Sequence, residues 1–425
     1  MIETSPRKKQ ERALLIGLEK EGVSKWDLRD SMEELRELAS SAGAEVVDTV
    51  TQKLQKPTAP YYIGKGKAEW IKDSLQDRQI TSVIFNDELS PAQGRNLENL
   101  LARKVLDRTQ LILDIFAQRA RSREGRLQIE LAQLQYLLPR LTRMWHHLSR
   151  QTGGIGTRGP GETQLEVDRR RVQERIARLE RELEAVRKTR AVQRQGRKRH
   201  QWPVAAVVGY TNAGKSTLLN LLTGADVVAA DRLFATLDPT TRSFVLPNKQ
   251  RVLLTDTVGF LRKLPHTLIE SFKATLEEVR EADLLIHIVD LSHPRVDEQM
   301  KAVDSVIKEL DAFGKQTLIV FNKIDNLGDC QLAETYVKRF PGSVAISART
   351  GEGVNKLVQA LESALGSWRL RSHFRIPSSK SALLAEIHRV GHVLELKYEG
   401  DDALVVAHVP PDLAQKLDCY AAQIL

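Results

Sequence analysis

The most constraining feature of this chain is a glycine-rich loop near its middle, with the pattern G-x-x-x-x-G-K-S. The apolar run 204–208 before the loop predicts a buried strand, and the leucine-rich run after it predicts a helix. In that context the glycines let backbone N–H groups wrap around a polyphosphate at the helix N-terminus. The pattern therefore predicts a nucleotide-binding α/β domain with a mostly parallel sheet. The loop residues are Gly209, Tyr210, Thr211, Asn212, Ala213, Gly214, Lys215 and Ser216.

Phosphate and magnesium contacts are expected from this loop and from a second motif. The Lys215 ammonium should reach the β- and γ-phosphates, and the Ser216 hydroxyl should ligate Mg²⁺. A D-x-x-G motif follows the strand-like run 251–255 and consists of Asp256, Thr257, Val258 and Gly259. We expect the Asp256 carboxylate just beyond the direct Mg²⁺ ligands and the Gly259 N–H against the γ-phosphate.

The segment between these two motifs predicts the first switch of such a domain. It contains Phe234, Ala235, Thr236, Leu237 and Asp238. One threonine here should complete the Mg²⁺ shell and sense the γ-phosphate. Thr236, Thr240 and Thr241 are all available, and spacing alone does not choose among them.

Two further motifs predict that the base is guanine. Asn322, Lys323, Ile324 and Asp325 follow the run 317–321, a continuous apolar stretch typical of a buried parallel strand. The Asp325 carboxylate can accept two N–H bonds from a guanine edge, whereas adenine would leave that buried charge unpaired. Ser347, Ala348 and Arg349 follow the next predicted strand and resemble the companion loop over the base.

The catalytic detail differs from that of Ras-like proteins, which have a water-orienting glutamine after D-x-x-G. This chain has Phe260 there, so that role is vacant or supplied elsewhere. Because hydrolysis is largely positioning and charge stabilisation, we expect slow intrinsic turnover and stimulation by a partner. The candidate catalytic residues are Lys215, Thr236 and Gly259. Asn212 leaves two interpretations open, a K⁺ site beside the phosphates or an asparagine that stabilises the turn.

Composition bounds the setting in which the chain works. Its 425 residues are 41% apolar and 28% charged, as in soluble globular proteins. The formal net charge of +9 suggests a polyanionic partner. Cys330 and Cys419 fit a reducing compartment rather than a disulfide framework. No apolar stretch approaches the ~18–20 residues that span a bilayer, and the N-terminus lacks a signal-peptide core. We therefore expect a cytoplasmic protein with no membrane span.

Residues 1–118 alternate strand-like and helix-like segments, which predicts an N-terminal α/β domain with a parallel sheet. We expect strands at 12–17, 45–50 and 82–85, and helices at 32–42, 68–75 and 90–101. The loop Gly64-Lys65-Gly66-Lys67 precedes one of these helices. It could bind phosphate or RNA, or it could be a glycine turn with solvated lysines.

Residues 119–200 predict an antiparallel helical hairpin followed by a basic linker. Two apolar stripes recur at alternating spacings of four and three, the pattern of a coiled-coil seam. Helices of this kind joined by a loop should pair antiparallel. The stripes are Leu127, Leu131, Leu134, Leu138, Leu141, Trp145 and Leu148, then Val172, Ile176, Leu179, Leu183 and Val186.

The joining loop, at 153–164, is longer and richer in glycine than a helix turn requires. Glycines permit close backbone approach, and arginines bind phosphate. The run 187–199 adds seven basic residues and no acid. We expect the tip to order against structured RNA, with a disordered connector as the alternative. The candidate RNA contacts are Arg150, Gly153, Gly154, Gly156, Arg158, Gly159 and Gly161.

Residues 201–370 are assigned to the nucleotide-binding domain, and 371–425 to a small C-terminal α/β module. The module should contain a helix at 382–388, strands at 392–398 and 403–409, and a closing helix at 412–421. Its sequence indicates no chemistry.

The assembled motifs resemble those of the HflX family of translation-associated GTPases. The segments 209–216, 234–238, 256–259, 322–325 and 347–349 match in order. The tip sequence, Gly-Gly-Ile-Gly-Thr-Arg-Gly-Pro-Gly-Glu-Thr-Gln-Leu, is more specific than the shared GTPase motifs. The resemblance covers nearly the whole chain and is weakest at its two ends. Phe260 is also what this family shows.

The resemblance implies a function that the spacing of residues does not show. HflX-like proteins bind the large ribosomal subunit, and their tip approaches the peptidyl-transferase region of the rRNA. In the GTP state they help to separate stalled or stress-inactivated ribosomes, which stimulate hydrolysis. The resemblance also implies Thr236 as the Mg²⁺ ligand and a second nucleotide site, for instance for ATP, at the Gly64–Lys67 loop. We expect a monomer and no DNA partner.

Three rival functions stay open. One is a tRNA-modification GTPase that uses the Asn212 loop, although the folate- and redox-related domains of that class are not recognisable here. A second is a non-catalytic RNA-binding scaffold with GTP as a structural ligand. The third is an ATP-dependent RNA remodeller acting through residues 1–118.

Overall fold

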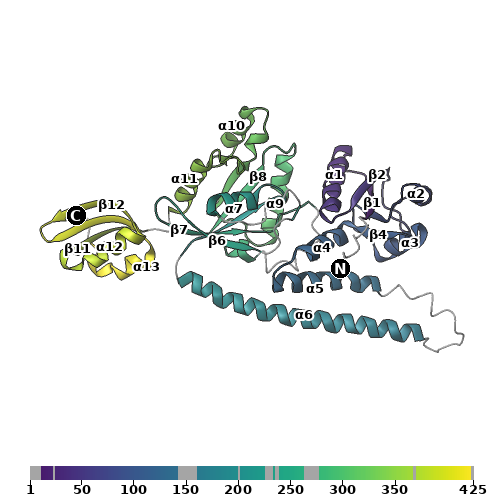
Figure 1. Ribbon diagram of the computed structural model, residues 1–425, viewed down its shortest axis with the longest axis horizontal. Helices are drawn as coiled ribbons and strands as arrows, with labels where there is room; N and C mark the ends of the chain where they lie inside the picture. Colours follow the sequence, from purple (N-terminus) through teal and green to yellow (C-terminus); the bar gives the residue numbers. More distant parts are fainter. Residues whose placement is uncertain are drawn as a thin grey trace, which may run out of the picture. The chain divides into compact units, whose positions relative to one another are not determined.

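The computed structural model describes residues 11–22, 24–141, 160–199, 202–224, 233–234, 239–262, 277–366 and 370–422, without the side chains of 160–165, 187, 190–199, 330 and 412 (Figure 1). The described residues up to Ala185 form one compact unit, and those from Val186 onward form a second. The division into four domains stays a prediction. Three sequence predictions lie outside the described residues: the first switch at 235–238, the hairpin tip up to 159, and the stripe residues Trp145 and Leu148.

The first unit opens with a four-stranded parallel sheet in the order β2-β1-β3-β4. Its strands are β1 (Arg12–Glu19), β2 (Glu45–Lys53), β3 (Ser82–Phe85) and β4 (Lys104–Asp107). The predicted α/β alternation is confirmed, because α1 (Lys25–Ser41), α2 (Lys65–Asp77), α3 (Pro91–Leu101) and α4 (Arg108–Arg119) separate or follow these strands.

The two faces of this sheet are covered by different helices. Helices α2 and α3 share one core with Ile16 and Leu18 of β1. Side chains alternate along a strand, so Gly17 faces the opposite side. A Cβ atom there would lie 2.5 Å from Met32 Sδ, which shows how closely α1 packs on β1. Helix α4 contacts α1 and β3 and completes this second layer.

Capping residues set where these helices begin. Helix α1 starts at Lys25, earlier than predicted, because the Ser24 hydroxyl accepts the Asp27 N–H at 3.0 Å. Helix α3 starts at Pro91, as expected, behind a capping box in which Ser90 and Gln93 bind each other's backbone N–H.

The predicted antiparallel hairpin is confirmed. It consists of α5 (Arg123–Leu141) and α6 (Pro160–Arg199). The seam joins three leucines of α5 to α6, namely Leu127, Leu131 and Leu134 against Ile176, Leu179 and Leu183. Arg175 binds Glu130 at 2.7 and 2.8 Å, and Arg123 lies 3.9 Å from Glu182. Later residues of α5 thus meet earlier residues of α6, which only antiparallel helices allow.

Helix α6 begins within the segment that the sequence assigns to the joining loop. Residues 160–164 are helical, and Pro160 is the first of them. Proline is favoured there because its missing N–H has no intrahelical partner and its φ is already helical.

A buried carboxylate attaches α5 to the parallel sheet. Asp107, at the end of β4, is 2% exposed. It accepts hydrogen bonds from the Tyr136 hydroxyl at 2.7 Å and from Arg140 at 3.3 Å. Because both donors lie on α5, the hairpin has a fixed root on the sheet.

The second unit contains a six-stranded sheet in the order β10-β9-β8-β5-β7-β6. All pairs are parallel except β6 with β7. The strands are β5 (Val204–Gly209), β6 (Thr240–Val245), β7 (Arg251–Asp256), β8 (Leu284–Asp290), β9 (Thr317–Asn322) and β10 (Val344–Ala345). The predicted mostly parallel sheet is therefore confirmed.

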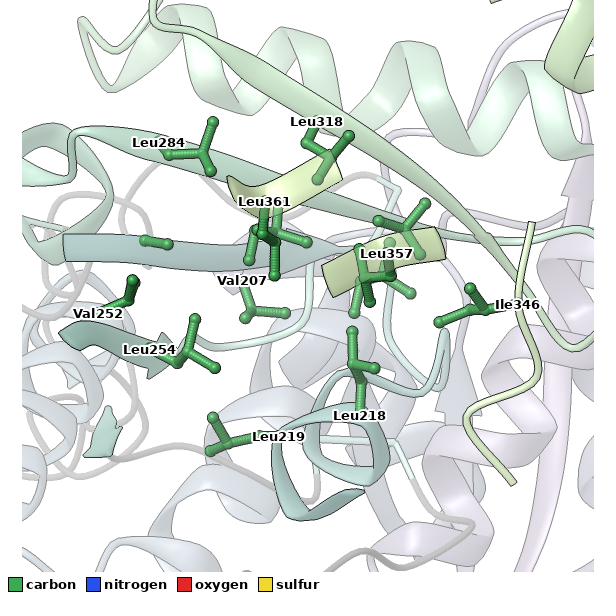
Figure 2. Close-up of a cluster of buried hydrophobic side chains, with 14 of the residues drawn as sticks. Val207, Leu218, Leu219, Val252, Leu254, Leu284, Leu318, Ile346, Leu357 and Leu361 are labelled. Atoms are coloured by element: carbon green, nitrogen blue, oxygen red, sulfur yellow. The ribbon is translucent and has the colours of Figure 1, made fainter. Parts of the chain in front are cut away.

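Two hydrophobic cores fix the helices on this sheet. Figure 2 shows leucines of α7 (Lys215–Thr223) and α11 (Val354–Ala364) packed beside Val207 and Leu254. On the opposite face, α9 (Val296–Glu309) and α10 (Cys330–Arg339) surround Phe321. Because β5, β7, β8 and β9 are neighbouring parallel strands, their carboxyl ends meet at one edge of the sheet. Open α/β sheets bind ligands at this edge.

The last element group is an antiparallel sheet in the order β11-β13-β12 with helices on one face. Its elements are β11 (Leu370–Pro377), α12 (Ser381–Val390), β12 (His392–Glu399), β13 (Asp402–Val409) and α13 (Pro411–Lys416). Strand β11 was not expected from the sequence, because only Phe374 and Ile376 of it point into the core. The closing helix is shorter than predicted and continues as a 3-10 turn at Asp418–Tyr420.

Replacing Leu179 by Ala should loosen the hairpin. This side chain is 0% exposed in the seam, so its loss should cost about 2–4 kcal/mol. Hydrogen–deuterium exchange of α5 and α6 peptides measures the effect. Leu137→Ala is the matched control, because that leucine of α5 is 40% exposed. Equal exchange in both variants would contradict the assigned seam.

Candidate nucleotide site

The glycine loop packs so closely on its neighbours that side chains are excluded at two positions. A Cβ at Gly209 would lie 2.3 Å from the Ile288 carbonyl oxygen, and one at Gly214 would lie 2.2 Å from Asn322 Nδ2. Gly214 also has φ +96°, which strains any L side chain. Helix α7 begins directly after it, so its first N–H groups point into the loop and form an anion site.

A buried lysine provides the positive charge of the loop. Lys215 is 7% exposed, and its Nζ donates to the carbonyl oxygens of Gly209 at 3.2 Å and Tyr210 at 2.7 Å. Burial lowers the pKa of this ammonium to about 8, against the opposing pull of Asp256 and with a small contribution from Lys323. An anion entering the loop would restore the charged form.

Oxygen donors suited to Mg²⁺ lie beside this lysine. The Ser216 hydroxyl donates to Asp256 Oδ2 at 2.7 Å, and Asp256 is 0% exposed at the end of β7. Hydroxyl and carboxylate oxygens are ligands that Mg²⁺ accepts. The donor set therefore fits the ion that the sequence predicts there.

The D-x-x-G segment runs directly against the glycine loop. The Phe260 N–H donates to the Gly209 carbonyl at 3.1 Å, and the Thr211 N–H donates to the Phe260 carbonyl at 2.8 Å. The Arg262 N–H then donates to the Tyr210 hydroxyl at 3.0 Å. Gly259 is consequently held beside the loop, and the Phe260 side chain is buried at 2% exposure.

A single asparagine connects the loop to both base motifs. Asn322 Nδ2 donates to the Ala213 carbonyl at 2.8 Å, and its Oδ1 accepts the Ala348 N–H at 2.9 Å. Asp325 is exposed in the 3-10 turn Ile324–Asn326. Arg349 is exposed within the turn that Ser347 closes by accepting the Thr350 N–H at 3.1 Å. The three motifs therefore meet at one edge of the sheet.

The sequence reasoning missed one residue of this edge. Asp290, the last residue of β8, holds Lys323 Nζ at 2.7 Å and thereby fixes the lysine of the base motif. Its position at the carboxyl end of a continuous apolar strand was the available signal.

Two of the three candidate threonines of the first switch lie within the described residues. Thr241 Oγ1 lies 3.0 Å from Thr255 Oγ1 within the sheet, and the backbone of Thr240 pairs with Asp256. Both threonines thus belong to β6. Phe234 is buried at 2% exposure, whereas Ala235, Thr236, Leu237 and Asp238 lie outside the described residues.

The predicted RNA contacts are almost entirely outside the described residues. Only Gly161 is included, in the first turn of α6. In the described segments, no helix combines the length and apolar character needed to cross a bilayer.

The glycine loop, the Ser216–Asp256 pair and the base motifs on this sheet define a P-loop GTPase. Three family descriptions match successive parts of the chain: a GTP-binding GTPase N-terminal region at residues 29–117, a GTP-binding GTPase middle region at 119–197, and a 50S ribosome-binding GTPase at 204–323.

Individual relatives agree along most of the chain. A protein named GTPase HflX from Caldanaerobacter subterraneus subsp. tengcongensis is 48% identical over 408 residues, covering 96% of this chain and 93% of its own. GTPase HflX from Escherichia coli is 46% identical over 384 residues, covering 90% of each. A solved complex of SsGBP with GDP covers 83% of this chain and 98% of its own at 27% identity, with a TM-score of 0.49. The chain belongs to the HflX family of GTPases, and it hydrolyses GTP.

Binding of GDP should take up a proton above about pH 8. The folded pKa of Lys215 lies at about 8, below its ordinary 10.5, so the free loop loses charge as pH rises through that value. The nucleotide phosphates favour the charged ammonium, and affinity should therefore fall between about pH 7 and 9. Calorimetry in buffers of different ionisation enthalpy measures the uptake. Guanosine, which lacks phosphates, is the control, and a flat GDP affinity across this range would contradict the prediction.

Replacing Asn322 by Ala should weaken both the fold and GDP binding. It leaves the buried Ala213 carbonyl and Ala348 N–H without their partner, at a cost of about 1–3 kcal/mol. Denaturant unfolding and GDP titration measure the two effects. Asn326→Ala, at an exposed position of the adjacent turn, is the control. If the Asn322 variant unfolds and binds GDP as the wild type does, the two hydrogen bonds of Asn322 do not contribute to stability or binding.

Proposed function

We propose that this GTPase binds the large ribosomal subunit and uses its nucleotide state as a switch that rescues stalled or stressed ribosomes by separating their subunits. The observation that carries the proposal is the match of residues 204–323 to a family described as a 50S ribosome-binding GTPase. A second observation supports the proposal: helix α6 continues through the arginine-rich run 187–199. Runs of basic residues of this kind bind RNA phosphates.

Each residue of the nucleotide site has a proposed role. Lys215 and the loop backbone hold the phosphates, Gly259 senses the γ-phosphate, and Asp325 selects guanine. Bound Mg²⁺ would neutralise phosphate charge, with Ser216 and Thr236 as its ligands and Asp256 behind them. Buried carbonyls already orient the Lys215 ammonium, so that it meets the phosphates without reorganisation.

The hairpin is proposed as the part that reads rRNA. Asp107 fixes α5 of the hairpin on the sheet, and six apolar side chains hold α5 and α6 together. Arg169, Arg170 and Arg171 are exposed along α6 and can contact phosphate together with Arg150 and Arg158 of the tip segment. The ribosome would order the switches and stimulate hydrolysis, which releases the protein.

Two ligand assignments accompany this proposal. We propose K⁺ beside the phosphates at Asn212, whose φ of +61° also suits a turn, and hydrolysis rates in K⁺ and Na⁺ test it. We propose ATP at the Gly64–Lys67 loop, where the Gly64 N–H donates to Gln52 at 2.9 Å. ATP binding that survives Lys215→Ala would support that second site. A cytoplasmic, monomeric protein completes the proposal.

Sedimentation with purified large subunits tests the function. The chain should pellet with a non-hydrolysable GTP analogue and far less with GDP. Deletion of 153–159 should abolish the difference, whereas Leu137→Ala, on α5 away from the seam, should leave it unchanged. Lys215→Ala should remove ribosome-stimulated hydrolysis.

Other outcomes would favour the rival functions. Pelleting that ignores the nucleotide would favour an RNA-binding scaffold, and preference for tRNA would favour a modification enzyme. ATP-dependent RNA remodelling that survives Lys215→Ala would favour an activity of residues 1–118.

A further inference from the structure

Phe260 leaves GTP hydrolysis without a side chain that can orient the attacking water. Tyr210 of the glycine loop pairs with Phe260 in a parallel bridge, and next to Tyr210 lies Thr211, the third residue of the loop. Its N–H donates to the Phe260 carbonyl at 2.8 Å, as part of a short parallel pairing between the loop and the D-x-x-G segment. Thr211 is therefore held beside the position from which the glutamine is missing.

The Thr211 side chain lies where the γ-phosphate contacts of the site converge. A Cβ built on Gly259 would lie 2.8 Å from Thr211 Cγ2 and 3.0 Å from Lys215 Nζ. Lys215 of a phosphate loop reaches the β- and γ-phosphates. Three residues from two motifs thus surround one point at the γ-phosphate end of the loop.

The Thr211 hydroxyl is buried and makes no hydrogen bond to the described residues. Thr211 is 6% exposed, and its Oγ1 has no hydrogen-bond partner among the described residues. An unsatisfied buried hydroxyl costs about 1–3 kcal/mol. Valine would fill the same volume without that cost, so packing alone does not explain the residue. A ligand that completes the hydrogen bond does explain it.

We propose that Thr211 Oγ1 positions the water that attacks GTP. The hydroxyl oxygen accepts a hydrogen bond from this water, and the hydroxyl O–H donates a hydrogen bond to a γ-phosphate oxygen without transferring its proton. The water oxygen bonds to the γ-phosphorus, and the bond from that phosphorus to the β–γ bridging oxygen breaks. Its electron pair leaves with GDP, and the water proton passes to a γ-phosphate oxygen. The threonine stays neutral throughout, so it acts as a positioning residue.

This assignment accounts for an aromatic residue at the usual glutamine position. The Phe260 side chain is buried, and its backbone carbonyl accepts the Thr211 N–H. Phe260 thus anchors the threonine, and the threonine hydroxyl takes over the orientation of water. Because a hydroxyl is a weaker organiser than a glutamine amide with two N–H donors and a carbonyl, turnover without a partner would be slow.

The test compares Thr211→Val, which keeps the shape, with Thr211→Ser, which keeps the hydroxyl. Single-turnover GTP hydrolysis is measured without ribosomes, so the result does not depend on the proposed partner. We expect Val to lower the hydrolysis rate about 10- to 100-fold, while Ser stays within about threefold of wild type. Affinities for GDP and for a GTP analogue should change by less than about twofold in both variants.

Three outcomes would overturn the proposal. In the first, the Val variant hydrolyses GTP at the wild-type rate. In the second, Val and Ser lose activity equally, so that the hydroxyl is not what matters. In the third, Val and also Thr211→Ala lose GDP binding in parallel with hydrolysis, which would make Thr211 a structural residue of the loop. A reduced affinity for GDP with aluminium fluoride, in Val alone, would support the proposal independently.

Discussion

A lysine ammonium buried against two backbone carbonyls is the interaction on which the nucleotide site depends. Burial disfavours the charge of Lys215 and lowers its pKa, and the carbonyls of Gly209 and Tyr210 compensate only in part. Phosphates supply the missing negative charge in a site with little water, where electrostatic interactions are strong. The rest of the second unit keeps this side chain in place: the close approach at Gly209, the start of α7 and the buried Asp256 beside it.

Order in the sheet turns this local interaction into a complete site. Strands β5, β7, β8 and β9 are adjacent and parallel, so their carboxyl ends deliver the loop, Asp256, Asp290 and Asn322 to one edge. Asn322 then binds the loop on one side and Ala348 on the other. A displacement of the base-binding segments would therefore also move the phosphate loop. The backbone pairing of Phe260 with the loop similarly joins the second switch to the phosphate end.

The first unit shows a different use of buried polarity. Asp107, at the end of a parallel strand, accepts hydrogen bonds from Tyr136 and Arg140 of α5. These bonds attach the helical hairpin to the sheet. Within the hairpin, the leucine seam and the Arg175–Glu130 ion pair hold α5 against α6. Arg169, Arg170 and Arg171 of α6 are exposed. Since relatives match nearly the whole chain, both units are features of the HflX family, whose GTPase activity this chain has.

The sequence alone determined the fold class, the α/β alternation of the first unit, the leucine seam of the hairpin and the motifs of the nucleotide site. Those features follow from local rules: apolar periodicity, capping signals such as Ser90 with Gln93, and glycines at fixed spacing before a helix. Tertiary structure decided the rest, because contacts between distant segments leave no local pattern. The ion pair between Asp290 and Lys323, the hydrogen bonds of Asp107 to α5, the edge strand β11 and the close approach of Thr211 to Gly259 all depend on how strands become neighbours. Packing decides which residue lies opposite another across a sheet, and the neighbouring residues in the sequence do not reveal that partner.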